Sequence, residues 1–243
     1  MRCDTCGNEA VCFQPYSGRY LCGRHLISDI ETRAKRTIRS HRWLRPGDHI
    51  AVPLAGDRRS AALLFFLRDL TGRRRDIHLI AILPPAEEIT DGQREAARTV
   101  AESLRLSCRE ILDSGVTRIA IPVSLDDVSQ GVLGEFLFGD VDRLVNPRQP
   151  GSDRLPIICP FISVPSAEID LYWDLKGTAV ALPAPGRAGN ILPRETRDLF
   201  EDYCRRHPAT KHAILSLADE LAQGDVTGIG CRRTGREVTG DGI

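Results

Sequence analysis

The fold is decided by residues 48–60, which read DHIAVPLAGDRRS. The first seven of these residues are mostly apolar and predict a buried strand. Apolar residues at helical spacing then predict a helix over 60–70, which Ser60 is placed to cap. A strand, a short loop with one glycine and an amphipathic helix make up the first half of a βαβ unit.

The same alternation continues on the carboxyl side of this stretch. A linker rich in Pro and Gly is expected over 146–153. The pattern predicts strands over 77–83, 116–123 and 155–164, and helices over 90–114, 125–138, 167–175, 196–206 and 210–221. Strands that alternate with helices of this length form a parallel sheet, so we expect an α/β protein with a Rossmann-like parallel sheet.

Ligands of such sheets bind beyond the carboxyl ends of the strands. The loop before residue 60 is therefore where a phosphate would lie, on a helix N-terminus with arginines beside it. The alternative is an ordinary turn that ends in a serine cap, and a single glycine does not distinguish the two. The candidate nucleotide-binding residues of this loop are Ala55, Gly56, Asp57, Arg58, Arg59 and Ser60.

Four candidate metal ligands lie in the first 25 residues, with the spacing Cys-x2-Cys-x15-Cys-x2-His: Cys3, Cys6, Cys22 and His25. Two such knuckles can close a tetrahedral Zn²⁺ site, and the short segment around them has too few apolar residues to fold without a metal. The alternative is a set of cysteines at chance spacing, but paired x2 knuckles are a specific signal. We therefore expect a small N-terminal zinc finger that holds one structural Zn²⁺.

The segment after the finger predicts a helix over 27–44 with a basic face. This face is either an ordinary solvated helix surface or, beside a zinc module, a surface that binds nucleic acid. Its candidate tRNA-binding residues are Arg33, Lys35, Arg36, Arg39 and Arg42.

Composition sets the broad class. The chain has 243 residues, of which 42% are hydrophobic and 27% charged, with a formal net charge of +0, as in soluble globular proteins. Overall charge therefore argues neither for nor against nucleic acid. Eight cysteines in a metal-type arrangement, with neither a secretory leader nor an apolar run of about 18 residues, predict a cytoplasmic protein without a membrane segment.

Residues 47–60 align without gaps on the G-D-x-I-A-V-x-L-S-G-G-K-D-S stretch of PP-loop ATP pyrophosphatases. The chain resembles in particular the TtcA/TtuA-type enzymes, which make 2-thiouridine or 2-thiocytidine in tRNA. Those of the 2-thiouridine type begin with the same finger and an I-E-x-R-x-x-x-T-I-R helix, which is similar to residues 30–39. Further similar blocks follow in the family's order: LDDVSQ at 125–130, GDVDRL at 139–144, VPSAEI at 164–169 and HPATK at 207–211.

The resemblance implies the adenine nucleotide alpha-hydrolase (PP-loop) type of sheet, and it adds Asp126 and Asp127 to the nucleotide-binding candidates. The chain departs from the family where the chemistry is carried. Asp57 replaces a glycine and would repel phosphate, and Arg59 replaces an aspartate that could hold Mg²⁺. We therefore expect weak or absent hydrolysis of ATP, with no residue at position 59 to hold Mg²⁺.

The family's three sulfur-handling or cluster-binding cysteines have no clear counterpart. Cys108 stands alone between the second and third predicted strands, and Ala184-Pro185-Gly186 replaces a Cys-Pro-Tyr element. We accordingly expect no iron–sulfur cluster. Cys231 resembles the remnant of a second knuckle, and the sequence assigns no role to Cys159 or Cys204.

Four segments are expected: a zinc finger at 1–26, a basic linker helix at 27–46, a PP-loop-like α/β domain at 47–180, and C-terminal helices with a degenerate knuckle tail at 181–243. This pattern favours a thiolation-family protein that binds tRNA or a nucleotide and has impaired or lost catalysis. The alternatives are an active ATP-dependent tRNA 2-thiouridine synthetase-type sulfurtransferase and an enzyme repurposed for another nucleotide reaction. The expected partner is tRNA, with a catalytic homologue or a sulfur-carrier protein as further candidates, and a homodimer is carried over from the family.

Overall fold

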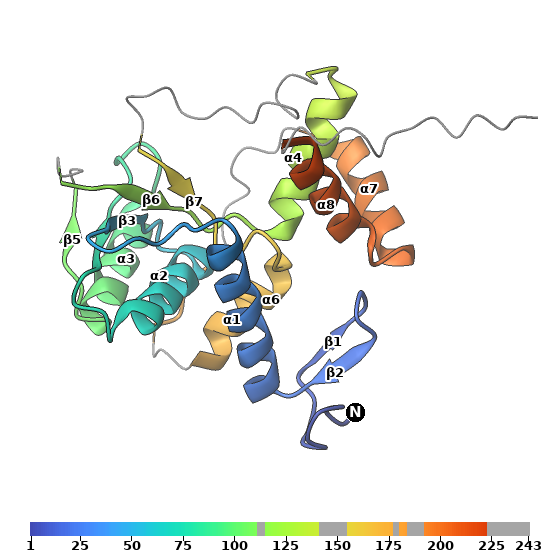
Figure 1. Cartoon of the computed structure of the whole chain (residues 1–243), viewed down its shortest axis with the longest axis horizontal. Coiled ribbons are helices and arrows are strands. Elements are labelled where there is room, and N and C mark those ends of the chain that lie inside the picture. The colour runs from blue at the N-terminus through green and yellow to red at the C-terminus, as the bar shows by residue number, and fades with distance from the viewer. Residues whose placement is uncertain (111–114, 141–154, 177–179, 184–191, 223–243) are drawn as a thin grey trace, which may run out of the picture.

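The computed structural model describes residues 1–110, 115–140, 155–176, 180–183 and 192–222 (Figure 1). Four features of the sequence lie outside these residues: the linker at 146–153, the end of the predicted third helix at 111–114, Ala184-Pro185-Gly186, and Cys231.

Five parallel strands form the central sheet in the order β5-β4-β3-β6-β7. Ala51 in the middle strand pairs with Ile80 on one side and with Ile119 on the other. The predicted α/β fold with a parallel sheet is therefore confirmed. The strands are β3 (His49–Pro53), β4 (His78–Ile82), β5 (Cys108–Arg109), β6 (Arg118–Ala120) and β7 (Ile157–Ile158).

The middle strand β3 is apolar because both of its faces are covered. Ile50, Ala51 and Val52 are fully buried, as expected for a central parallel strand. The strand order changes direction between β3 and β6, so the loops that follow these two strands face each other at the carboxyl edge of the sheet.

Helices α1 (Gly23–Ser40), α2 (Arg58–Thr71) and α6 (Ser166–Lys176) form a layer against this sheet (Figure 1). Helix α2 packs on β3 and β4, α6 packs on α2, and α1 packs on α6. Helix α1 contributes a buried stripe to this layer, made of Leu26, Ile30, Ala34, Thr37 and Ile38.

A second group of helices lies beyond the carboxyl ends of the strands: α4 (Leu125–Leu137), α7 (Arg194–Arg206) and α8 (Thr210–Ala222) (Figure 1). The N-terminal segment folds as an antiparallel hairpin of β1 (Cys12–Gln14) and β2 (Arg19–Leu21). In the described part of the chain, no helix is both long and apolar enough to cross a membrane.

Several predicted helices have different ends in the structure. Helix α3 (Asp91–Ser103) stops well before the predicted residue 114, because Arg105 takes a positive φ of 56° and the chain then enters β5. Helix α2 is capped by Asp57, whose side chain accepts the Ser60 amide at 2.8 Å, and the expectation that Ser60 caps it is wrong. Helix α1 starts at Gly23, so the proposed division between residues 26 and 27 falls inside it.

Candidate functional site

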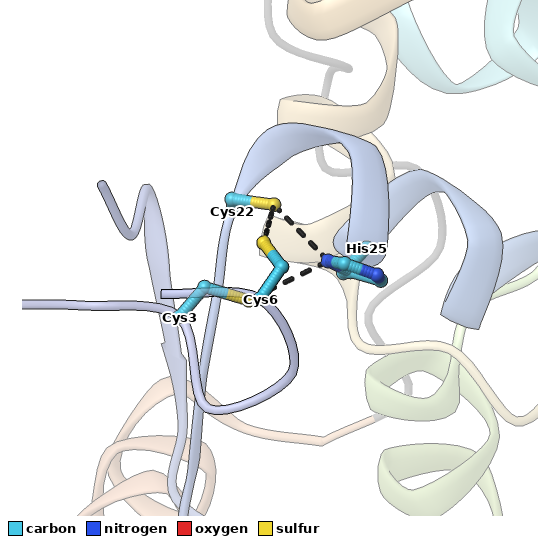
Figure 2. A group of neighbouring side chains, drawn as sticks. All are labelled: Cys3, Cys6, Cys22 and His25. Carbon is cyan, nitrogen blue, oxygen red and sulfur yellow. Dashed lines mark hydrogen bonds between the residues drawn. The ribbon is translucent and has the colours of Figure 1, made fainter. Parts of the chain in front are cut away.

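The four predicted metal ligands converge at the base of the hairpin (Figure 2). Cys3 and Cys6 come from the first turn of the chain, Cys22 is the N-cap of α1, and His25 lies in the first turn of that helix. Gly7 follows the first knuckle with a φ of 71°, a conformation that glycine adopts without strain. The start of a helix therefore supplies half of the ligand set.

The distances between these side chains match a tetrahedral metal site. The Sγ atoms of Cys6 and Cys22 are 3.7 Å apart, and Nδ1 of His25 lies 3.3 Å from Sγ of Cys22 and 3.5 Å from Sγ of Cys3. Metal bonds of about 2.3 Å to sulfur and about 2.05 Å to nitrogen place tetrahedral ligand atoms about 3.8 Å (S to S) and about 3.6 Å (S to N) apart. All four ligand atoms lie within 4.8 Å of one another, so this zinc-finger-like site is the right size for a zinc-sized ion.

The electrostatics of the site also suit a metal. Burial opposes ionisation of Cys3, but hydrogen bonds from the backbone at Cys22, Thr5 and Cys6 lower the pKa of its thiol to about 6. A thiolate is the form that ligates metals. Among the described residues, these four are the one group of three or more such side chains close enough to share an ion.

A buried ion pair joins the finger to the sheet domain. Glu168 of α6 is only 5% exposed, and its carboxylate accepts from Gln14 Nε2 at 3.2 Å and from the Tyr16 hydroxyl at 2.7 Å. The same carboxylate pairs with the Arg33 guanidinium, which also lies 2.9 Å from Asp29. The hairpin, α1 and α6 therefore meet at one charged residue that sequence reasoning did not single out.

The Arg33–Glu168 ion pair removes one arginine from the predicted basic face of α1. Arg33 has a side chain only 15% exposed and committed to two carboxylates, so its expected place on an exposed surface is wrong. Lys35 lies 3.0 Å from Glu31 one turn away. Arg36, Arg39 and Arg42 are exposed, and no ion pair involves them within the described part of the chain.

The predicted phosphate loop follows β3, and the N-terminus of α2 lies at its end. Asp57 Oδ1 accepts the Ser60 amide, and the Pro183 carbonyl accepts the Arg58 amide at 3.2 Å. Ser60 Oγ accepts the Ala55 amide at 3.2 Å. Three of the backbone amides that could bind an anion, those of Ala55, Arg58 and Ser60, are thus already paired with acceptors from the chain itself.

Gly56 shows how closely this loop is covered. Its φ is +69°, and a Cβ at this position would lie 2.0 Å from the Gln93 carbonyl oxygen at the start of α3. Only glycine can tolerate this contact. The backbone of α3 therefore packs directly against the loop, on the face where glycine leaves room.

The charged candidates of the crevice pair with one another. Arg58 Nη1 lies 3.2 Å from Asp174, and Arg59 Nη1 lies 3.5 Å from Asp127. Asp127 also completes the capping box of α4, since its side chain accepts the amide of the N-cap residue Ser124 at 2.8 Å. The structure therefore brings Arg59 and Asp127 together, but as a salt bridge rather than as an open phosphate or Mg²⁺ site.

Asp126 is held by the C-terminal helices. Its carboxylate pairs with Lys211 Nζ of α8 and accepts the Ser166 amide at 2.6 Å. Burial alone would raise the pKa of Asp126, but the Lys211 ammonium outweighs that effect and lowers it. Lys211 also lies 2.7 Å from Glu201 of α7, so this ion pair ties α4, α7 and α8 together.

The remaining described cysteines are not arranged as a cluster. Cys108 lies in β5 and Cys159 follows β7, and burial raises the pKa of both thiols, of Cys159 to about 11. Cys12 and Cys204 line a cavity of about 360 Å³ between the hairpin and helices α7 and α8. Burial raises the pKa of these two thiols as well, which reduces their nucleophilicity.

Comparison with known proteins places the chain in a family. Residues 2–27 match the family model for the N-terminal LIM domain of the 2-thiouridine synthetase TtuA. A relative described as a probable sulfurtransferase, from Methanocaldococcus jannaschii, is 35% identical, and the alignment covers 93% of this chain and 83% of that protein. The chain belongs to the TtuA/NcsA-type tRNA thiolation family.

Two further relatives agree with this assignment. Cytoplasmic tRNA 2-thiolation protein 1 of Bos taurus is 33% identical over 91% of this chain and 78% of its own length. The tRNA 2-thiolation protein NcsA of Haloferax volcanii is 25% identical over 99% of this chain and 96% of its own length. The resemblance inferred from the sequence is therefore confirmed along nearly the whole chain.

A solved structure of a thiolation-family protein corrects one expectation. The U34-tRNA thiolase NcsA from Methanococcus maripaludis aligns with a TM-score of 0.77 and 20% identity, covering 92% of this chain and 87% of that one. That thiolase was solved with its [4Fe-4S] cluster. Our expectation of no iron–sulfur cluster, which rested on unmatched cysteines, is overturned by this finding.

Proposed function

We propose that this protein binds tRNA as a member of the thiolation family and no longer activates it with ATP at the loop after β3. The observation that carries the proposal is the pairing of the α2 N-terminus with acceptors of the chain itself. Asp57 takes the Ser60 amide at 2.8 Å, and the Pro183 carbonyl takes the Arg58 amide at 3.2 Å.

The energies involved favour the closed loop over a bound phosphate. Displacing the Asp57 carboxylate would remove a helix cap, which costs about 1 kcal/mol. Leaving it about 4 Å from a phosphate charge would add a repulsion of about 4 kcal/mol at an effective dielectric constant of 20. These two costs are alternatives: since about 1.4 kcal/mol is a factor of ten in affinity, displacing the carboxylate would weaken phosphate binding about fivefold, and leaving it in place would weaken binding about a thousandfold.

The neighbouring cations offer little compensation. Arg58 pairs with Asp174 and donates from Nε to the Leu182 carbonyl at 3.1 Å, and Arg59 pairs with Asp127. A nucleotide would have to break these contacts before either guanidinium could hold a phosphate. The contacts in the crevice therefore favour a loop whose polar groups pair within the chain over a loop that binds ATP.

The exposed arginines of α1 support binding to tRNA. Arg36, Arg39 and Arg42 project from the end of α1 without an acid partner among the described residues. A guanidinium can pair bidentately with a phosphate, and contacts of this kind position a nucleic acid without reading its sequence. The finger and the Glu168 ion pair fix the orientation of this helix on the sheet domain.

The second candidate is an active tRNA 2-thiouridine synthetase-type sulfurtransferase. The observation in its favour is the 35% identity, over 93% of this chain, to the relative described as a probable sulfurtransferase. An active enzyme would require Asp57 and Pro183 to leave the α2 N-terminus when ATP arrives.

One experiment separates the two candidates. The purified protein is incubated with ATP, Mg²⁺ and bulk tRNA, pyrophosphate and AMP are measured, and tRNA binding is followed by gel shift. We expect binding of tRNA without consumption of ATP, and more than tenfold weaker binding by the Arg36→Glu/Arg39→Glu variant at moderate salt. A matched Arg205→Glu/Arg206→Glu variant, altered on α7, should bind as the parent does. Pyrophosphate release that depends on tRNA and is lost in Arg58→Ala would establish the active candidate instead.

A further inference from the structure

A second arginine cluster lies at the amino edge of the sheet, where the loop before β3 meets the loop before β4. Arg45 belongs to the first loop, and Arg73 and Arg75 belong to the second; all three are exposed. The Gly47 amide donates to the Asp76 carbonyl at 2.8 Å, which fastens the two loops to each other. The cluster is therefore held in place before any partner binds.

The acidic groups of these two loops, Asp48 and Asp76, are already neutralised. Asp76 pairs with Arg74, whose Nε lies 3.1 Å from Oδ1. Asp48 is 5% exposed, and its carboxylate lies 2.8 Å from Arg118 Nε. Each carboxylate is thus matched by its own arginine.

Four guanidinium groups are left over. No ion pair involves Arg42, Arg45, Arg73 or Arg75 within the described part of the chain, so the loops before β3 and β4 carry four uncompensated positive charges. Arg42 has a positive φ of 52° and comes two residues after the end of α1, so the loop before β3 begins where the basic face of the helix ends. The two basic surfaces are therefore adjacent in the chain at Arg42.

We propose that Arg45, Arg73 and Arg75 form a second contact surface for the phosphate backbone of tRNA, an inference that rests on the proposed function. Unpaired arginines on preformed loops suit phosphate contacts, because little order has to be imposed on binding. The exposed His41 ring, stacked on Trp43 with centroids 4.4 Å apart, adds an aromatic face to the segment between α1 and β3.

The position of this cluster has a consequence for how tRNA lies on the protein. It adjoins His49 at the start of β3, whereas the loop with Asp57 follows Pro53 at the other end of the same strand. A five-residue strand spans roughly 15 Å, so the RNA backbone contacts a different edge of the sheet from the crevice. The surface can hold tRNA without using the loop after β3.

The test is a salt titration of tRNA binding with the full chain. Loss of two phosphate contacts should lower the slope of log K against log salt by about 1.8 and weaken binding about thirtyfold at 0.15 M salt. We expect this result for Arg73→Ala/Arg75→Ala, and parental behaviour for Arg205→Ala/Arg206→Ala, the matched loss of two charges on α7. Circular dichroism checks that both variants are folded.

Each other outcome overturns the inference in a distinguishable way. The second surface alone is refuted if the parent and the Arg36→Glu/Arg39→Glu variant behave as proposed but Arg73→Ala/Arg75→Ala binds tRNA like the parent. The remaining use of the cluster would then be a site for an acidic protein. If both double variants weaken equally, only net charge matters and the assigned surface is wrong. If the parent does not bind tRNA at all, the proposed function and this inference fall together.

Discussion

Replacing Glu168 with glutamine should destabilise the protein, because one buried carboxylate holds the finger, α1 and α6 together. The glutamine oxygen can still accept from Tyr16, but its amide nitrogen would face the donating amide of Gln14. Arg33 would lose the closer of its two carboxylates and keep Asp29 at 2.9 Å. The substitution thus removes a charge and one acceptor without changing side-chain volume.

The size of the effect follows from the burial of this pair. Breaking one side of a buried ion pair costs about 3–5 kcal/mol, because the other charge is left without compensation. Arg33 retains one partner, so the lower end, about 3 kcal/mol, is expected. For a chain of this length that loss corresponds to a fall in Tm of roughly 6–12 °C.

Urea and thermal unfolding followed by circular dichroism would measure this loss. Glu195→Gln, an exposed change in the first turn of α7, is the control and should stay within about 0.5 kcal/mol of the parent. A Tm for Glu168→Gln within 2 °C of the parent, roughly the precision at which such shifts are read, would refute the reasoning. It would mean that water already screens the pair and that apolar packing alone holds the finger.

Three further changes test other parts of the structure. Gly56→Ala should lower the free energy of unfolding by more than about 3 kcal/mol or prevent folding, because the added Cβ would overlap a backbone carbonyl. Gly18→Ala is the control: its φ is similar but the space around it is open, so it should cost only about 1 kcal/mol in urea unfolding. Cys22→Ala should abolish metal binding and loosen the finger while the sheet domain stays folded, and Cys12→Ala should keep the metal; elemental analysis, with iron and acid-labile sulfide measured alongside zinc, decides this. The pKa of Asp126 is lowered in the folded state, so its contribution to stability is complete above about pH 4 and is lost as the pH falls through the lowered value; Asp126→Asn should flatten this acid limb of the stability profile.

The sequence predicted those features that depend on neighbouring residues. Strands β3 and β4 are continuous apolar runs, and the four metal ligands are paired within two short knuckles, so local pattern was sufficient for both. β5 was missed because a two-residue strand carries no periodicity.

The errors concern side chains whose partners are distant in sequence. Arg33 fits an exposed basic face by its spacing, yet Glu168, 135 residues further on, draws it into the interior. Asp57 was interpreted only as repelling phosphate, although an aspartate just before a helical pattern is also a preferred N-cap residue, which sequence can reveal. The contact of Gln93 with Gly56 has no sequence signal, because it depends on how α3 packs.

The Glu168 ion pair can form only late in the synthesis of the chain, because its partners are far apart in sequence. The four metal ligands are complete once His25 has been made, so the finger can close early. Gln14 can pair early with Asp29, but its buried partner Glu168 is made 154 residues later, which at about 5–20 residues per second takes roughly 8–30 s. During that interval α6 does not exist, and the apolar stripe of α1 has no surface to pack against. The nascent protein therefore passes through a stage in which the finger is folded and the apolar stripe of α1 is exposed to solvent. Chaperones would be needed at this stage.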